Sequence, residues 1–239
     1  MTHRYKRKIN NMRLREISRR PIWLRRMPNM LLRDNVYELI RSDILACVLA
    51  PGEQLREQDM AAQYETSRQP IRDALLRLER EHLVTVAPRQ GYQVNPISLA
   101  DAQDLFRFRL ALEPACATEA IERADDATLA DLDRYRTLPE GQAFTEYNRE
   151  FHSAMARASG NNRMSIVACD LIAQADRLVR VSVDAIKGRD PAALVAEHCA
   201  IIDLLQRRDV RATRKLLKAH ISQAEKRVIT ALSRSAIRS

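Results

Sequence analysis

The fold of the N-terminal part of the chain is decided by the stretch that begins Ser67-Arg68-Gln69-Pro70-Ile71-Arg72-Asp73-Ala74-Leu75. Ser67 is a favoured helix N-cap residue, and Pro70 stands in the first turn, where its missing N–H costs little. Apolar residues then recur at helical spacing, at Ile71, Ala74, Leu75 and Leu78. These features predict a helix over 67–81 that turns one face toward a core.

The segments on both sides of this helix predict a winged arrangement. Apolar residues at helical spacing predict two further helices, over 31–49 and 54–64. After the helix, alternating stretches at 83–87 and 92–97 flank the turn Pro88-Arg89-Gln90-Gly91, which predicts a β-hairpin. A helix–turn–helix followed by a two-stranded wing is an architecture that reads DNA.

The remainder of the chain, residues 98–239, carries only helical periods. We expect an all-α antiparallel bundle of about six helices, over 98–123, 128–136, 142–159, 162–186, 191–207 and 210–233. Ser98 and Asp209 favour helix starts, and Gly160 favours a helix end. The predicted fold class is therefore mainly α, with a winged helix–turn–helix of three helices and a hairpin over 31–97 and a bundle over 98–239.

The composition excludes several classes of protein. The 239 residues are 46% hydrophobic and 30% charged, which is typical of a globular chain and not of a disordered one. No apolar run reaches the roughly 18 residues that a membrane helix needs, so we expect no membrane partner. The four cysteines form no CxxC pair, which argues against a zinc finger and favours reduced, buried thiols in a cytoplasm.

The first 30 residues form a basic arm that accounts for the formal net charge of +9. Residues 1–30 contain ten basic residues and one acidic residue, whereas residues 31–239 contain thirty of each. Such an arm suits contacts with DNA phosphates. The alternatives are a merely solvated segment, or a protein that begins at Met27 or Met30.

The predicted helix over 67–81 presents candidate DNA-reading residues. Arg68 and Arg72 stand four positions apart and share a face, from which they can reach guanine or a backbone phosphate. Exposed arginines are also common on ordinary helices, and residues 31–96 hold 8 basic and 10 acidic residues. DNA reading therefore requires the basic side chains to gather on one face. The full set of candidates is Arg33, Thr66, Ser67, Arg68, Gln69, Arg72, Arg89 and Gly91.

Three histidines and one asparagine fall on inward faces of the predicted bundle. Asn148 and His152 stand four positions apart, and His198 and His220 each share a stripe with apolar residues. Three imidazoles and a side-chain oxygen can form a metal site with an open position. The alternative is that each histidine is an ordinary core residue bonded to its neighbours.

Arg109 also lies on an apolar stripe, which places a cation against the core. A buried guanidinium needs an anionic partner. That partner is either Glu113, one turn later, or the carboxylate of a bound effector, which a guanidinium can bind through two hydrogen bonds.

The N-terminal motifs resemble the winged helix of GntR-family bacterial transcription regulators. The departures from the family pattern are mild, since Gln69 replaces the usual Thr, His82 the usual Gly and Gln90 the second wing Arg. The resemblance implies a homodimer that binds a short inverted repeat in double-stranded DNA. It rests on the runs Leu55-Arg56-Glu57-Gln58-Asp59-Met60-Ala61, Ser67 to Leu75 as quoted above, Leu78-Glu79-Arg80-Glu81-His82-Leu83-Val84 and Arg89-Gln90-Gly91-Tyr92-Gln93-Val94.

The C-terminal part resembles the FCD effector-binding domain of the FadR-type subfamily. The resemblance implies a divalent metal, with zinc expected first and nickel or manganese as alternatives, and a small organic or sugar acid as the effector that bridges the metal and Arg109. Its implied metal ligands are Asn148, His152, His198 and His220. Asn148 carries no charge where an aspartate would, which should either weaken metal binding or leave the metal more dependent on an anionic ligand. The motifs that carry the resemblance are Arg109-Leu110-Ala111-Leu112-Glu113, Phe151-His152, Ala158-Ser159-Gly160-Asn161, Glu197-His198 and Ala219-His220-Ile221.

The leading hypothesis is a cytoplasmic, homodimeric transcription regulator, not an enzyme, whose repression is released by the effector. One alternative is a metal-dependent hydrolase that activates water at the three-histidine site. Against it, we expect no general base beside the histidines, because Glu150 points to another helix face. A second alternative is a structural DNA-binding protein with steep salt dependence and little sequence preference.

Overall fold

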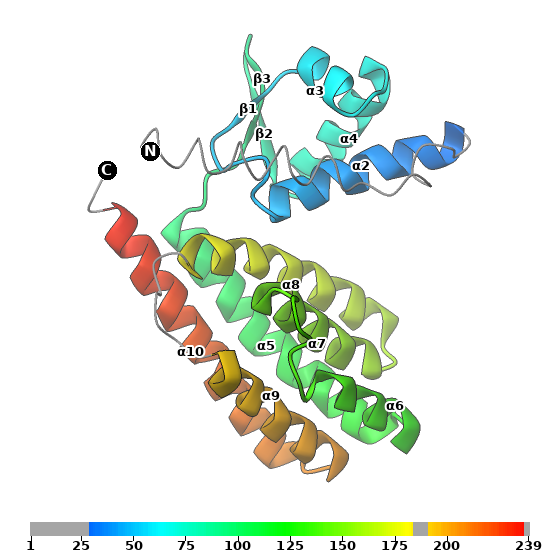
Figure 1. Cartoon of the computed structure of the whole chain (residues 1–239), viewed down its shortest axis with the longest axis vertical. Coiled ribbons are helices and arrows are strands. Elements are labelled where there is room, and N and C mark those ends of the chain that lie inside the picture. Colours follow the sequence, from blue (N-terminus) through cyan, green and yellow to red (C-terminus); the bar gives the residue numbers. More distant parts are fainter. Residues whose placement is uncertain (1–28, 184–190, 237–239) are drawn as a thin grey trace. The chain divides into compact units, whose positions relative to one another are not determined.

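The computed structural model describes residues 29–183 and 191–236, and the side chains over 35–180 and 191–233 (Figure 1). The chain divides into two compact units, and the division falls between Ile97 and Ser98. Of the predicted basic arm, residues 1–28 lie outside the described residues. The predicted helix end at 184–186 lies outside them as well.

The N-terminal unit combines three helices with a small antiparallel sheet. The strands lie in the order β1-β3-β2. Helix α2 packs on α4, and fully buried aliphatic side chains fill the space around them, including Ile40, Ile44, Ile71, Leu75 and Leu78. The predicted winged helix–turn–helix is confirmed. Its elements are α2 (Asn29–Leu45), β1 (Gln54–Leu55), α3 (Glu57–Gln63), α4 (Arg68–Arg80), β2 (Val84–Ala87) and β3 (Gly91–Val94).

Three boundaries in this unit differ from the prediction. The helix predicted over 54–64 begins only at Glu57, because β1 pairs with β3 and makes the wing three-stranded. The helix predicted over 31–49 ends at Leu45, and the chain turns through a left-handed residue at Cys47, with φ of 58°. The second wing strand ends at Val94. The pairing of β1 with β3 thus fixes where α3 begins, which apolar periodicity alone left ambiguous.

Gly91, at the start of β3, is required by two features of the wing. Its φ is +92°, which L-residues with a side chain rarely adopt. A Cβ atom at this position would lie 2.6 Å from the carbonyl oxygen of Leu55 in β1. Arg89, in the same turn, also has a positive φ of 66°. Gly91, one of the predicted DNA-reading candidates, therefore has a structural role in the wing.

The C-terminal unit is all-helical, as predicted. The segment predicted as one helix over 128–136 is split into a short α-helix and a 3₁₀-helix. The predicted helix starts are confirmed, because the Ser98 hydroxyl accepts a hydrogen bond from the Asp101 N–H and the Asp209 carboxylate accepts one from the Ala212 N–H. The helices are α5 (Leu99–Arg123), α6 (Asp126–Ala130), η2 (Asp131–Tyr135), α7 (Phe144–Ala158), α8 (Asn162–Val183), α9 (Pro191–Gln206) and α10 (Val210–Ala236).

Helix α5 lies at the centre of this unit and contacts α7, α8, α9 and α10 (Figure 1). Its inward face and those of α7 and α10 supply a buried core that includes Phe106, Phe151, Met155 and Leu217. Among the cysteines, which are all free, only Cys116 is fully buried. The expectation of four buried thiols is therefore wrong, because Cys47, Cys169 and Cys199 are partly exposed.

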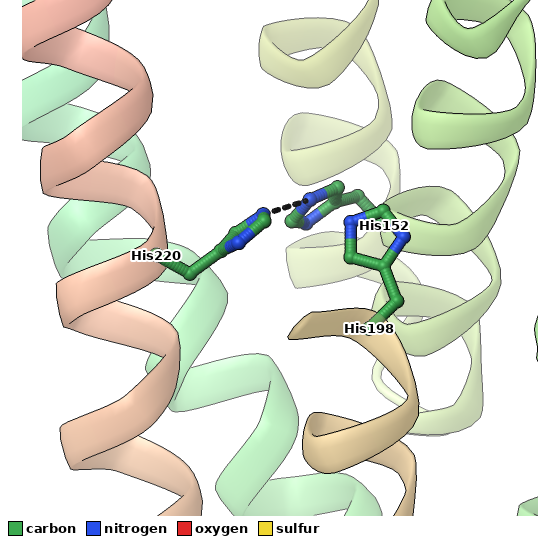
Figure 2. Close-up of side chains that lie close together, drawn as sticks. All are labelled: His152, His198 and His220. Carbon is green, nitrogen blue, oxygen red and sulfur yellow. Dashed lines mark hydrogen bonds between the residues drawn. The ribbon is translucent and has the colours of Figure 1, made fainter. Parts of the chain in front are cut away.

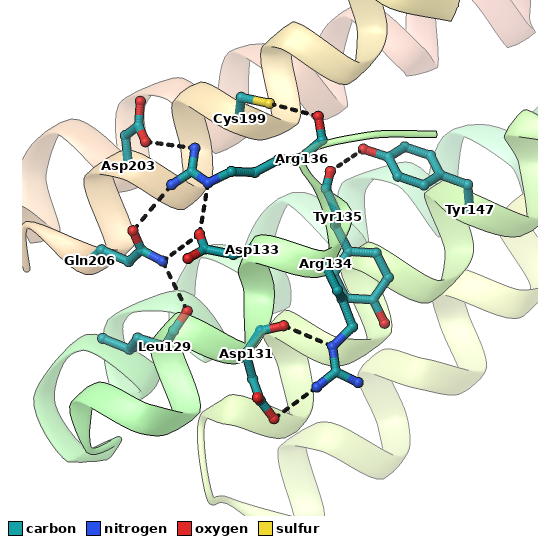
Figure 3. Close-up of polar contacts among 10 residues, drawn as sticks. All are labelled: Leu129, Asp131, Asp133, Arg134, Tyr135, Arg136, Tyr147, Cys199, Asp203 and Gln206. Carbon is teal, nitrogen blue, oxygen red and sulfur yellow. Dashed lines mark hydrogen bonds and ion pairs between the residues drawn. The ribbon is translucent and has the colours of Figure 1, made fainter. Parts of the chain in front are cut away.

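A polar network fastens η2 to its neighbours (Figure 3). Arg136, directly after η2, pairs with Asp203 of α9 at 2.8 Å and with Asp133 of η2 at 2.7 Å. Its Nη2 donates to Gln206 at 3.1 Å. The hydroxyl of Tyr147 in α7 donates to the carbonyl oxygen of Tyr135 at 2.5 Å. The network thus ties η2 to both α7 and α9, the two helices that carry His152 and His198.

Candidate functional site

Three histidines from three different helices meet inside the C-terminal unit (Figure 2). His152 comes from α7, His198 from α9 and His220 from α10, and their side chains are 1%, 0% and 5% exposed. Each offers one ring nitrogen to a group in which all three atoms lie within 4.8 Å of one another. The prediction from helical spacing that these three histidines point inward is thereby confirmed.

Two of the histidines are held at Nδ1 by carboxylates. Nδ1 of His152 lies 2.7 Å from Glu113 of α5, and Nδ1 of His220 lies 2.7 Å from Glu197 of α9. An ionised carboxylate only accepts hydrogen bonds, so each Nδ1 carries the hydrogen and each Nε2 of a neutral ring has a free lone pair. These two Nε2 atoms face each other at 3.2 Å.

The third histidine is held by a hydroxyl. Nδ1 of His198 lies 3.2 Å from the Tyr147 hydroxyl, which uses its own hydrogen to bond the carbonyl oxygen of Tyr135. The hydroxyl must therefore accept from Nδ1, which leaves the lone pair on Nε2 of His198. Within the described part of the chain, that buried Nε2 has no hydrogen-bond partner.

Burial favours the neutral form of His152 and His198. Burial lowers the pKa of His152 to about 4, despite the opposing effect of Glu113, and burial also lowers the pKa of His198. Burial alone would raise the pKa of Glu113, but the charge of Arg109 and the contact with His152 outweigh it and lower that pKa to about 2. An ionised glutamate beside a neutral imidazole is the pairing that orients a metal-binding histidine.

The donor set fits a divalent metal. Neutral imidazoles with converging lone pairs are the ligands that zinc prefers, and Zn–N bonds of about 2.0–2.1 Å place tetrahedral ligand atoms about 3.3 Å apart. The observed separation of 3.2 Å between Nε2 of His152 and Nε2 of His220 is close to that value. A cation would also give the orphaned Nε2 of His198 a partner, which a neutral core cluster does not.

A cavity of about 280 Å³ adjoins this cluster. Asn148, one turn before His152 on α7, lines the cavity, so the predicted fourth ligand is brought to the site. Arg109 lines it too, while its Nε donates to Glu113 at 2.5 Å. Of the two partners considered for Arg109, Glu113 is therefore observed, and a ligand carboxylate would be an additional one.

The carboxylates beside the histidines were missed by sequence reasoning. We expected no general base beside the histidines, but two carboxylates do lie there, since Glu113 and Glu197 contact His152 and His220 directly. Glu197 neighbours His198 in sequence but bonds a histidine of another helix, and no spacing rule relates the two. The predicted bystander Glu150 accepts a hydrogen bond from Gln142.

Five of the eight predicted DNA-reading residues lie at or just before the start of α4, namely Thr66, Ser67, Arg68, Gln69 and Arg72. Ser67 takes the N-cap position with an extended backbone, although its hydroxyl makes no capping hydrogen bond. Arg89 is exposed in the wing turn, and the Arg33 side chain lies outside the described residues. Thr66 is half-buried, and the exposed candidates at this helix end are Ser67, Arg68, Gln69 and Arg72.

One reading-helix arginine has a partner that the sequence did not indicate. Arg72 donates two hydrogen bonds of 2.8 Å to Glu57 of α3. The contact lowers the pKa of Glu57, mainly through the hydrogen bond from Arg72. The guanidinium is thus held against α3, whereas Gln69 donates to Asp73 within α4. A carboxylate next to a DNA-reading arginine limits the directions in which that arginine can reach.

The fold and the exposed helix end are those of a winged-helix DNA-binding transcription regulator with an all-helical C-terminal unit. The chain belongs to the GntR family of bacterial regulatory proteins and carries an FCD domain. Residues 32–94 match the gntR family of bacterial regulatory proteins, and residues 104–223 match the FCD domain. Proteins of this family are transcription regulators and not enzymes, so the hydrolase alternative has no support.

Three similar proteins illustrate the match. The HTH-type transcriptional repressor RspR of Escherichia coli is 27% identical over 84% of this chain and 90% of its own length. A helix–turn–helix regulator from an unstable DNA locus of Streptomyces ambofaciens is 30% identical over 79% of this chain and 81% of its own. The structure of a GntR regulator from Rhodococcus sp. RHA1 shares the fold, with a TM-score of 0.68, 24% identity, and coverage of 83% of this chain and 97% of that one.

No helix in the described ranges is long and apolar enough to cross a membrane.

Proposed function

We propose that this protein is a ligand-responsive repressor that binds a short inverted-repeat operator as a homodimer. A small carboxylate, bound at a divalent metal in the C-terminal unit, would release it from DNA. The similarity to RspR, which is a repressor, supports the direction of regulation. Binding of the effector would change operator affinity through a coupling of about 1–3 kcal/mol between the two units.

The observation that carries the sensor half of this proposal is the convergence of three Nε2 lone pairs. Their Nδ1 atoms are all committed elsewhere, so the cluster has acceptors and no proton to share among them. His152, His198 and His220 would hold the metal, with Asn148 as a further oxygen ligand. When bound, the metal supplies a Lewis-acidic position that attracts a carboxylate oxygen.

The DNA-binding half rests on the exposed N-terminal end of α4. Arg68 and Gln69 are exposed there, on a helix whose opposite face is buried through Ile71 and Leu75. An arginine that reaches guanine contributes about 1–3 kcal/mol of discrimination between bases. The N-terminal helix end also favours phosphate.

The test is a selection of bound duplexes from a random pool at physiological salt, with zinc present and with zinc removed. We expect enrichment of one short palindrome. Arg68→Ala should lose that preference while keeping most non-specific affinity, whereas Arg80→Ala, an exposed arginine at the other end of α4, should keep both. A pool without enrichment in either condition would overturn sequence-specific reading and support a non-specific DNA binder.

Fluorescence anisotropy with the selected palindrome tests the proposed response to the effector. Zinc-loaded protein should release the duplex when a small carboxylate is added, and protein with His198→Ala should not. If the acid never changes DNA affinity in zinc-loaded wild-type protein, the proposed sensor role is wrong, even if the palindrome is bound.

A further inference from the structure

The walls of the cavity beside the histidine cluster are mostly apolar. Phe144 begins α7, Val179 belongs to α8, Pro191 and Leu194 to α9 and Val228 to α10, and two alanines complete the lining. Four helices therefore turn carbon-rich side chains toward the same space. Apolar side chains that enclose a ligand favour apolar ligand surface, because that surface is removed from water on binding.

The polar side chains in the lining are concentrated around the histidine cluster and two arginines. Apart from the histidines, they are Arg109, Thr145, Asn148 and Arg227. Arg109 already donates to Glu113, and Asn148 lies one turn from His152. Each ligand hydroxyl that enters such a space without a hydrogen-bond partner loses its bonds to water and lowers affinity.

Four charged side chains stand at the cavity and the histidine cluster. Arg109 and Arg227 line the cavity, and the two carboxylates of Glu113 and Glu197 stand behind the histidines. A divalent metal at the histidines would add two positive charges to these four groups. Arg227 follows His220 by seven residues on α10, which is two helical turns and the same face. The metal-loaded cavity therefore attracts an anion.

We infer that the effector is a carboxylic acid with a compact apolar body, aromatic or branched aliphatic, rather than a polyhydroxylated sugar acid. This inference rests on the proposed function and narrows its effector class. The carboxylate lies toward the histidine cluster and Asn148. The body lies against Phe144, Leu194 and Val228. A volume of about 280 Å³ corresponds to about nine water molecules at about 30 Å³ each, so the acid is small.

The experiment is isothermal titration calorimetry on the full-length protein, after its zinc content has been measured. The apolar probes are phenylacetate and 4-methylpentanoate, and the polyhydroxylated probes are gluconate and galactonate. We expect at least one apolar acid to bind tenfold or more tightly than both hydroxylated acids. Removal of zinc with a chelator should weaken the binding of that acid at least tenfold.

Two matched pairs of variants separate the effect of the apolar walls on affinity from the effect of the cationic side chain. Val228→Thr keeps the shape of a wall residue but adds a hydroxyl, and it should weaken phenylacetate about fivefold without weakening gluconate. Val167→Thr, at an exposed position of α8 outside the cavity, should change neither. Arg227→Gln should weaken both classes of acid alike, whereas Arg214→Gln, on the exposed face of α10, should weaken neither.

Each of the other outcomes overturns a specific part of the proposal. Protein that holds no zinc overturns the proposed metal site and, with it, this inference. Zinc-loaded protein that prefers the hydroxylated acids, binds both classes equally or binds none of the four overturns the inference about the apolar body and leaves the metal site standing. A Val228→Thr variant that binds phenylacetate as wild type does overturns the placement of the body against α10.

Discussion

Nε2 of His152 lies 3.2 Å from Nε2 of His220, and each ring donates its Nδ1 hydrogen to a glutamate. In neutral rings the two facing nitrogens are then both acceptors, and two acceptors at this distance repel each other. The geometry is favourable once a cation lies between them. By their burial, the three histidines resemble ordinary core histidines. Their hydrogen bonds differ, because the facing Nε2 atoms have no hydrogen to share.

Metal removal should therefore destabilise the C-terminal unit. With free zinc at 100 times the dissociation constant, binding should add about 2.7 kcal/mol to the free energy of unfolding. Scanning calorimetry of the full chain, with zinc and with chelator, measures the shift. His198→Ala should abolish most of it, while His82→Asn, at an exposed left-handed position of the N-terminal unit, should retain it. Equal stabilisation of the wild type and of His198→Ala by zinc would contradict the site.

The Tyr147 hydroxyl should matter for the metal although it is no ligand. It accepts from Nδ1 of His198 and so sets the tautomer of that ring. We expect Tyr147→Phe to weaken zinc binding about 10- to 100-fold, as is usual when a group that orients a ligand is lost. Competition with a chromogenic chelator measures the zinc affinity of both proteins. Tyr135→Phe is the control, because Tyr135 takes part through its carbonyl oxygen, and a similar loss there would disprove the tautomer argument.

Glu113→Gln should strongly destabilise the C-terminal unit. Glu113 is buried and pairs with Arg109 at 2.5 Å, so the substitution leaves a buried guanidinium without its counter-charge. Breaking such a pair costs about 3–5 kcal/mol. The same helix supplies a control in Glu119, which pairs with Arg123 at the same spacing but at the surface. Glu119→Gln should cost about 0.5 kcal/mol or less. Urea unfolding followed by circular dichroism compares the two, and equal costs would refute the role of burial.

Gly91→Ala should destabilise the wing more than Gly52→Ala does. Both glycines have a positive φ, of 92° and 80°, so both substitutions carry backbone strain of about 1–2 kcal/mol. Only the Cβ at position 91 would collide, 2.6 Å from the carbonyl oxygen of Leu55, because nothing lies within 4 Å at position 52. Thermal unfolding of the N-terminal unit should show the difference. Indistinguishable variants would mean that β1 moves away at little cost.

Much of the fold could be predicted from the order of residue types. The winged helix, the all-helical C-terminal part and the capping roles of Ser98 and Asp209 depend on neighbours within a few residues, and they were predicted correctly. The strand β1 was not, because its two residues are recognised only by their pairing with β3. The 3₁₀-helix η2 lies within the predicted α-helix over 128–136, since the two helix types share their apolar spacing over one or two turns.

Helical periodicity is enough to assign His152, His198 and His220 to inward faces, and all three are buried. The partners of these side chains depend on how the helices pack. Glu113 and Tyr147 reach the histidines from positions 39 and 51 residues away in the chain. Side-chain hydrogen bonds act over about 3 Å, so such partners are set by how helices pack and not by local spacing. Helix packing therefore gives the cluster its chemistry, which is a set of imidazole rings with free lone pairs on Nε2.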